Sequence, residues 1–177
     1  FSLSLKARPD AACTGPQDLC FIAIKKTLDS GSFLASYSLF YTEAGRFGAE
    51  LGYGGGQGLQ ITSADTFAIG SGWHDVQLNL ARDVDGAIDE VSLYVDGQLH
   101  AQHRAALPAL AFTTSGFYLG AGNFLGRADS EYRRNFNGAI DNVRLSDVPL
   151  APVPEPGTWA LFAAGLLAVG RVVRRRA

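Results

Sequence analysis

The feature that most constrains the fold is an alternation of apolar and polar residues that recurs along the first 150 residues. At the start of the chain, Leu3, Leu5 and Ala7 alternate with serines and basic residues. A period of two is that of a β-strand with one buried face. Further strand-like runs cover residues 21–24, 33–41, 47–53, 76–80, 91–95, 117–119 and 139–145. Glycine-rich segments separate them and no amphipathic helix precedes Pro152, so the sequence predicts an all-β sandwich or jelly roll.

Three short segments predict hairpins between these strands. Asp96-Gly97 is a strong two-residue hairpin signal, and residues 43–45 separate two alternating runs. Residues 54–58 (Gly-Gly-Gly-Gln-Gly) resemble a nucleotide-binding loop only superficially, because the Gly-Lys-Ser/Thr ending and the following helix are both missing. We therefore expect residues 54–58 to be a hairpin tip.

The distribution of charge argues against a nucleic-acid partner. Of the 15 basic and 17 acidic residues, four arginines and one glutamate fall in residues 153–177, which leaves the rest of the chain with a net charge of −5. An acidic domain is a poor electrostatic partner for phosphate backbones. A cation or a neutral sugar remains compatible with this charge.

The two cysteines are seven positions apart, with Thr14-Gly15-Pro16 turning the chain between them. Cys13 and Cys20 flank a strand-like run, which favours a disulfide that closes a loop in an oxidising compartment. The alternative is two unpaired thiols, one of them buried at the start of a strand.

Several motifs occur in an order that resembles a known family. Residues 73–76 read Trp-His-Asp-Val, residues 93–97 Leu-Tyr-Val-Asp-Gly, residues 117–120 Phe-Tyr-Leu-Gly, and residues 138–145 Gly-Ala-Ile-Asp-Asn-Val-Arg-Leu. This set resembles the laminin G-like, concanavalin A-like jelly-roll family. The resemblance implies a two-sheet antiparallel jelly-roll sandwich over residues 1–150, with its termini side by side. It also implies an opening strand upstream of Phe1.

Asp141 is the candidate metal ligand. It shares strand parity with Val143 and Leu145, and an inward carboxylate needs backbone amides or a cation as partner. The family resemblance implies calcium, with Asp129 and Glu131 of the polar loop at residues 127–134 as assisting ligands. Hydrogen bonding of Asp141 to the adjoining loop is the favoured alternative, and no other cofactor is expected.

Nothing in the sequence indicates catalysis. Related jelly-roll glucanases carry the spacing Glu-x-Asp-x-x-Glu on one strand, which this sequence lacks. The acidic cluster at residues 83–90 is interpreted as a solvated turn, and no serine has nucleophile-elbow spacing. His100 and His103 should lie on opposite faces of a strand, and His74 should make a surface contact. We therefore expect a binding protein rather than an enzyme, with a glycoside-active enzyme as the alternative.

The composition changes abruptly after Leu150. A proline-rich linker at residues 151–156 contains Pro154-Glu155-Pro156, and an apolar run follows at residues 157–170, which reaches residue 173 when Arg171 is included. The chain then closes on four basic residues: Arg171, Arg174, Arg175 and Arg176. Since buried core helices do not end in such a cluster, residues 157–177 predict one short transmembrane helix and a basic tail that stops at the cytoplasmic face.

These three tail features together resemble the PEP-CTERM sorting signal of Gram-negative, biofilm-forming bacteria. The resemblance implies export, a transient inner-membrane intermediate, and processing near Pro154-Glu155-Pro156 by an exosortase. The product would reach the cell surface or the extracellular matrix. The leading hypothesis is a surface or matrix protein that binds a glycan or another protein, and a structural matrix component without a specific ligand is a further alternative.

Overall fold

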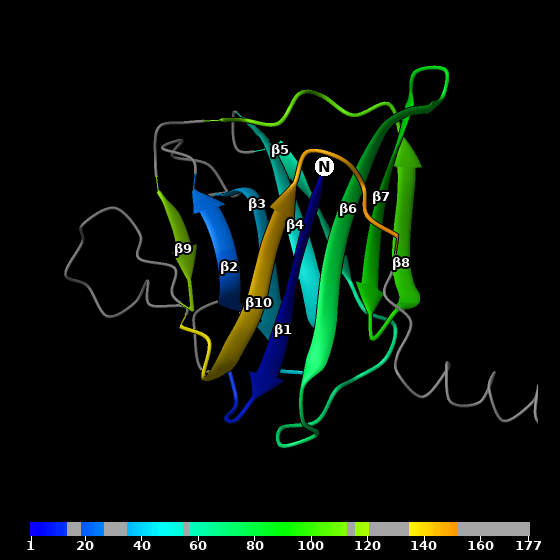
Figure 1. The fold of residues 1–177 in the computed structure, drawn as a ribbon. Helices are drawn as coiled ribbons and strands as arrows, with labels where there is room; N and C mark the ends of the chain where they lie inside the picture. Colours follow the sequence, from blue (N-terminus) through cyan, green and yellow to red (C-terminus); the bar gives the residue numbers. More distant parts are fainter. Residues whose placement is uncertain (14–18, 27–34, 55–56, 113–115, 121–134, 152–177) are drawn as a thin grey trace, which may run out of the picture.

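The computed structural model describes residues 1–13, 19–26, 35–54, 57–112, 116–120 and 135–151. Within them, two five-stranded antiparallel sheets pack face to face (Figure 1). The first sheet has the order β10 (Gly138–Ser146), β1 (Ser2–Pro9), β6 (His74–Asp85), β7 (Ile88–Val95) and β8 (Gln98–Ala105). The second has the order β5 (Gln57–Thr62), β4 (Phe47–Gly54), β3 (Ala35–Thr42), β2 (Leu19–Lys26) and β9 (Phe117–Leu119). This part of the chain contains no helix, which confirms the predicted all-β class.

The first and last strands of the sandwich lie side by side, as expected. In register, Leu3 of β1 is paired with Leu145 of β10 on one side and with Leu78 of β6 on the other. The backbone of Phe1 extends the ladder, because it donates to and accepts from Leu80 at 2.9 Å. A further strand upstream of Phe1 stays a prediction.

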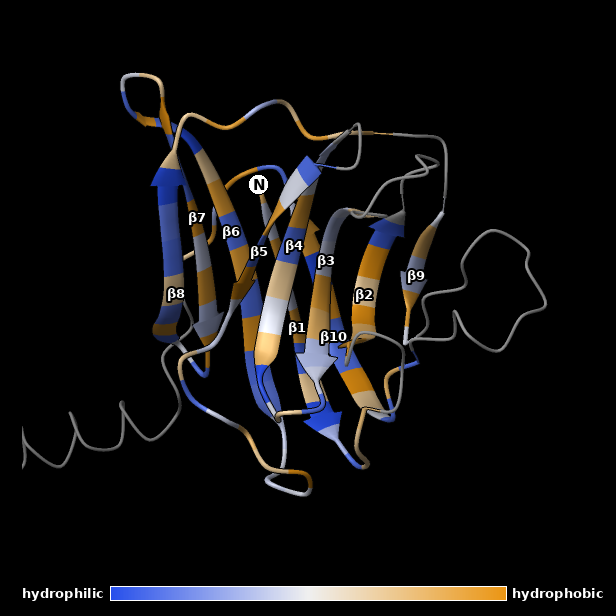
Figure 2. Ribbon diagram, turned by 180° about the vertical axis from the view of Figure 1, so that it is seen from behind, coloured by the Kyte–Doolittle hydropathy of each residue, from blue (hydrophilic) through white to orange (hydrophobic). Residues whose placement is uncertain are grey.

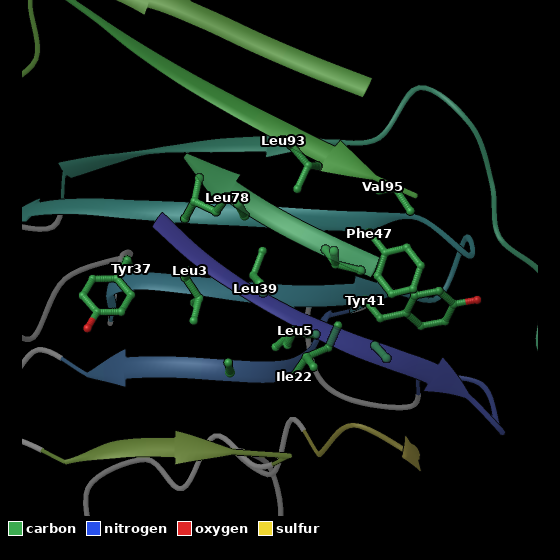
Figure 3. Close-up of a cluster of buried hydrophobic side chains, with 14 of the residues drawn as sticks. Leu3, Leu5, Ile22, Tyr37, Leu39, Tyr41, Phe47, Leu78, Leu93 and Val95 are labelled. Carbon is green, nitrogen blue, oxygen red and sulfur yellow. The ribbon is translucent and has the colours of Figure 1, made fainter. Parts of the chain in front are cut away.

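The core lies between the two sheets and is built from the inward residues of the predicted alternation (Figure 3). The first sheet contributes Leu3, Leu5, Ala7, Val76, Leu78, Leu80, Val91, Leu93 and Val95, all buried. The second contributes Ile22, Tyr37, Leu39, Tyr41, Phe47, Ala49 and Leu51. Burying each large apolar side chain contributes about 1.5–3 kcal/mol relative to exposure.

β2 is hydrophobic along most of its length (Figure 2), and apolar residues of β2 and β3 form a second cluster beside the main core. Phe21, Ile24 and Phe40 form a separate buried cluster with Leu19 and Ala35. A register shift between Phe21 and Ala23 allows two neighbouring residues of β2, Ile22 and Ala23, to belong to the same inner cluster.

The turn residues form hairpins at the positions that the sequence predicts. Asp96 and Gly97 join β7 to β8 with φ angles of 53° and 77°, which is the conformation of a type I′ turn. Gly45, at a φ of 76°, closes the turn between β3 and β4. β4 and β5 pair antiparallel on either side of the predicted glycine-rich tip, although residues 55–56 lie outside the described residues.

The predicted disulfide is present between Cys13 and Cys20, with the Cα atoms 5.6 Å apart. Both cysteines are buried and belong to the core. Cys13 follows β1 of the first sheet and Cys20 lies in β2 of the second. The bond therefore fixes the connection that joins the two layers of the sandwich.

The expected inward orientation of Asp141 is wrong. The ladder pairs Ser4 with Arg144 and then Lys6 with Asp141, so β10 carries one extra residue. Asn142, at a φ of 51°, accommodates this β-bulge. One extra residue reverses the side-chain parity, so Asp141 is exposed and its Oδ1 accepts the Asn142 amide at 2.7 Å.

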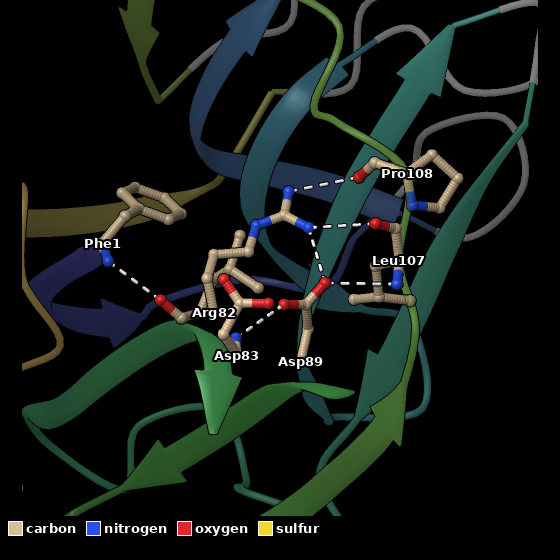
Figure 4. A network of polar contacts seen from close by, with 7 residues as sticks. Phe1, Arg82, Asp83, Asp89, Leu107 and Pro108 are labelled. Atoms are coloured by element: carbon tan, nitrogen blue, oxygen red, sulfur yellow. Dashed lines mark hydrogen bonds and ion pairs between the residues drawn. The ribbon is translucent and has the colours of Figure 1, made fainter. Parts of the chain in front are cut away.

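The acidic cluster is only partly the solvated turn that was expected. Asp83 and Asp85 are exposed, but the side chain of Asp89 is only 6% exposed. Arg82 Nη1 donates to Asp89 Oδ2 at 2.6 Å, and the amides of Asp83 and Leu107 donate to the same carboxylate at 3.1 Å (Figure 4). Burial acts to raise the pKa of Asp89, but these donors outweigh it and hold the pKa below the ordinary aspartate value.

The chain that follows β10 crosses the outer side of the first sheet (Figure 1). The Leu150 carbonyl accepts hydrogen bonds from Gln77 Nε2 at 2.8 Å and from Asn79 Nδ2 at 2.9 Å. Gln77 also donates to Asn79 Oδ1 at 2.9 Å, and both amides are buried. Two side chains of β6 therefore fix the last residues before the proline-rich linker.

Acid should destabilise the fold through Asp89. A carboxylate whose folded pKa is depressed stabilises the native state above the unfolded pKa, and this contribution is lost as the pH falls below about 4. We expect Asp89→Asn to lower stability at pH 7 and to flatten the acid limb of a stability-against-pH curve from urea unfolding. Asp83→Asn, at an exposed position where Asn tolerates the positive φ, is the control; an equal effect there would contradict the assignment.

Asn79→Ala should destabilise the sandwich. The change removes one donor from the Leu150 carbonyl and the acceptor of Gln77, and leaving a buried polar group unsatisfied costs about 1–3 kcal/mol. Urea unfolding should report a loss in that range, whereas Gln102→Ala, at an exposed position of β8, should change stability little. Equal stabilities of the two variants would show that Asn79 does not hold the segment around Leu150.

Candidate functional site

An exposed tryptophan at one end of the first sheet is the best candidate for ligand contact. Trp73 directly precedes β6 and is 44% exposed. The Arg8 guanidinium lies 5.3 Å from the centre of its ring. These two residues meet because β1 and β6 pair Ala7 with His74. Asp10 holds the guanidinium through a two-pronged contact of 2.9 and 3.1 Å.

The Arg8 and Asp10 side chains beside this indole are charged. Hydrogen bonds from Arg8 to Asp10 raise the pKa of the guanidinium, so it stays charged at physiological pH. Lys6 pairs with Asp75 at 3.3 Å on the same side of the sheet. An exposed ring beside fixed donors and acceptors is the chemistry of a site that stacks on the apolar face of a ligand and binds its hydroxyl groups.

The histidine of the Trp-His motif lies below this surface. His74 Nδ1 contacts Asp96 Oδ2 at 2.6 Å, and Nε2 contacts Ser71 Oγ at 2.7 Å. The rings of Phe47 and Phe67 pack against the imidazole, with centroids 5.6 and 4.9 Å away. The prediction of a surface contact for His74 is therefore wrong, because its side chain is only 11% exposed.

The loop that carries Trp73 is fixed at several points. The Gly70 amide donates to the Pro9 carbonyl at 3.0 Å, and Tyr41 Oη donates to the Phe67 carbonyl at 2.5 Å. Gly70 and Gly72 have φ angles of 77° and 105°, which few other residues adopt. The loop thus presents Trp73 from a fixed backbone.

A carboxylate that the sequence analysis did not single out lies on the outer side of the second sheet. Glu50 of β4 is 8% exposed and accepts hydrogen bonds from Ser38 at 3.3 Å and from Gln60 at 3.2 Å. The three strands are adjacent, so register alone brings these residues together. The alternation in the sequence predicts that Glu50 lies on the face of β4 that points away from the core. Its hydrogen-bond partners become apparent only from the pairing of β3, β4 and β5.

The remaining histidines do not lie on opposite faces as expected. His103 is paired with the inward Val91, whereas β8 has a register shift between Leu99 and Ala101 that leaves His100 as the extra residue. The His100 ring then packs on Phe67, with centroids 5.4 Å apart, and its side chain is 7% exposed. Both histidines therefore lie on the inner side of β8.

The predicted calcium site stays a prediction. Asp141 is exposed on a β-bulge and contacts its own neighbour, and Asp129 lies outside the described residues. The described ranges contain no group of three His, Cys, Asp or Glu residues that could hold a metal ion.

A protein-family model identifies the superfamily to which the fold belongs. The model for the concanavalin A-like lectin/glucanases superfamily, of laminin G type, matches residues 1–153. The chain belongs to this superfamily. The motifs at Trp73, Asp96 and Asp141 are therefore those of a laminin G-like jelly roll, and the resemblance derived from the sequence is confirmed. No curated protein sequence matches the chain.

Solved structures share this fold at low sequence identity. A putative carbohydrate-binding protein from Bacteroides ovatus matches with a TM-score of 0.57 and 18% identity, over 84% of this chain and 38% of that one. The CBM40 module of a Ruminococcus gnavus IT-sialidase, bound to α2,3-sialyllactose, matches with a TM-score of 0.57 and 18% identity, over 85% and 77%. A Trypanosoma rangeli sialidase matches with a TM-score of 0.55 and 18% identity, over 84% of this chain but 20% of that one.

The C-terminal tail matches a second, separate family model. Residues 152–176 match the PEP-CTERM protein-sorting motif, which confirms the family prediction for this segment. The motif indicates secretion through an exosortase and a cell-surface or extracellular location. Pro154, Glu155, Pro156, the apolar run and the four arginines lie outside the described residues, and no helix within the described part is long and apolar enough to cross a membrane.

Proposed function

We propose that this chain is an exported surface or matrix protein whose jelly roll binds glycans at the surface formed by Trp73, Arg8 and Asp10. The observation that carries the proposal is the exposed indole, held beside a charged pair at the end of the first sheet. Aromatic rings stack on the apolar faces of sugars, while guanidinium and carboxylate groups bind their hydroxyls. The carbohydrate-binding proteins among the structural neighbours are consistent with this class of ligand.

The rival function, a glycoside-active enzyme, rests on the buried Glu50. A glycosidase needs a second carboxyl group about 5–10 Å away across a cleft. Two of the groups that contact Glu50 are the hydroxyl of Ser38 and the amide of Gln60. We propose binding without glycoside cleavage, and release of reducing sugar from a bound glycan would favour the rival.

Trp73→Ala should weaken glycan binding at least about tenfold, which corresponds to about 1.4 kcal/mol. The measurement is a glycan array followed by calorimetry on the best ligand, with and without calcium. Phe112→Ala is the matched control, since Phe112 is 68% exposed and belongs to the loop after β8. An equal loss in both variants, or none in Trp73→Ala, would contradict the assignment of the surface, and binding that requires calcium would support the predicted metal site.

The sorting proposal is that an exosortase processes the tail at Pro154-Glu155-Pro156 while residues 157–173 briefly span the inner membrane. The four terminal arginines would stay at the cytoplasmic face, because a charged side chain at the bilayer centre costs about 2.5–3.5 kcal/mol on insertion scales. We expect the two prolines to favour an extended backbone at the glutamate, which would suit recognition by a peptidase.

Replacing Pro154, Glu155 and Pro156 with alanine should block processing but not insertion, since the apolar run is unchanged. The full-length chain should then accumulate in the inner membrane of a host that has an exosortase, as immunoblots of membrane fractions would show. Pro152→Ala is the control and should be processed normally. Processing of the triple variant at the parent rate would show that the tail is an ordinary anchor.

A further inference from the structure

Ser71, His74 and Asp96 form a continuous hydrogen-bonded chain at the surface beside Trp73. Ser71 Oγ lies 2.7 Å from His74 Nε2, and His74 Nδ1 lies 2.6 Å from Asp96 Oδ2. A nucleophile in contact with a base that a third group orients is the arrangement of serine hydrolases, which recurs on unrelated folds in different chain orders.

With Asp96 ionised and His74 neutral, the direction of each hydrogen bond follows from the chemistry of the three groups. An ionised Asp96 can only accept, so His74 Nδ1 carries the proton and donates. In the neutral imidazole, Nε2 then has a free lone pair and accepts the hydroxyl proton of Ser71. This is the tautomer that a general base needs in order to activate a serine.

The surroundings distinguish the roles of the three residues. The Asp75 amide donates to Asp96 Oδ1 at 2.8 Å and so holds the carboxylate in place. Phe47 and Phe67 pack against the His74 ring and shield it from water. Ser71 is exposed, and a Cβ built at the adjacent Gly72 would meet no atom within 4 Å. The base is therefore shielded, while Ser71, two residues before Trp73 in the chain, is exposed.

We propose that Ser71 is the nucleophile of an ester-cleaving site, with His74 as general base and Asp96 as the residue that positions it. Ser71 Oγ attacks the ester carbonyl carbon and its proton passes to His74 Nε2. The carbon–oxygen bond of the ester then breaks, and His74 gives this proton to the departing alkoxide. Water hydrolyses the acyl-serine by the same route, which releases the carboxylic acid and restores Ser71.

The substrate class is a small ester presented at a surface, because the serine lies in an open turn rather than in a cleft. The proposal goes beyond glycan binding, since the hydrogen-bonded chain uses neither Arg8 nor Asp10. It also differs from glycosidase chemistry, which would require paired carboxyl groups.

A fluorophosphonate probe tests the nucleophile directly on the full-length chain in membrane fractions or mild detergent. Attack by Ser71 Oγ would form a phosphorus–oxygen bond with loss of fluoride, and mass spectrometry should find the adduct on Ser71. Labelling should disappear in Ser71→Ala and persist in the control Ser146→Ala. Hydrolysis of p-nitrophenyl acetate should fall at least about 100-fold in Ser71→Ala, as expected when general-base and nucleophilic catalysis are lost.

Asp96→Asn tests the positioning role. Asn tolerates the positive φ of this turn position, so the melting temperature should change little. The amide no longer enforces the reactive tautomer of His74, so kcat should fall while KM stays unchanged. A variant with the same kcat as the parent would show that Asp96 has a structural role alone.

The proposal is overturned if Ser71→Ala is labelled as strongly as the parent chain and hydrolyses the ester at the same rate. Ser71 would then serve only as a hydrogen-bond partner for the imidazole. Glycan binding would be unaffected by that result, since Trp73→Ala tests it separately.

Discussion

The pairing of β1 with both β10 and β6 is the contact on which the rest of the sandwich depends. β6, β7 and β8 follow one another as local hairpins, but β10 joins the first sheet only through β1. Leu3 faces Leu78 on one side and Leu145 on the other, so strands about 140 residues apart in sequence close the sheet. Such non-local pairing is entropically costly to form. It places Arg8 beside Trp73 and carries the chain back across the first sheet at Leu150.

Polar networks secure the segments that the apolar core does not reach. Asp89 ties Arg82 to the chain after β8, and Gln77 with Asn79 holds the Leu150 carbonyl. In each case a buried polar group of the first sheet satisfies backbone atoms of an irregular segment, which would otherwise lose hydrogen bonds on leaving water. His74 also links two segments, but through side chains, because it contacts Ser71 Oγ in the loop before β6 and Asp96 Oδ2 in the β7–β8 hairpin.

The motifs that carry the family resemblance both stabilise the turns and place polar and aromatic side chains next to one another. The Trp-His segment carries an exposed ring and a shielded imidazole, and the Asp-Gly turn carries the carboxylate that contacts the imidazole. Gln77 and Asn79 hold Leu150 on the outer side of β6. These two residues lie three and five positions after His74 in the same strand. The last described residues before the sorting tail thus lie against the sheet that also carries the candidate ligand surface.

The alternation of residues such as Leu3, Leu78 and Leu93 was enough to predict the strands, the buried face and the all-β class, because side-chain period depends only on the local chain. The Asp96-Gly97 turn and the cysteine pair were local signals too, and the tail motif needed no fold. The bulges at Asn142 and His100 were not predictable, since an extra residue is set by the partner strand, and each one changes which side chains face inward. The meeting of Ser71, His74 and Asp96, like the burial of Asp89, was decided by tertiary structure alone, because hydrogen bonds between separate turns depend on distances that sequence spacing does not determine.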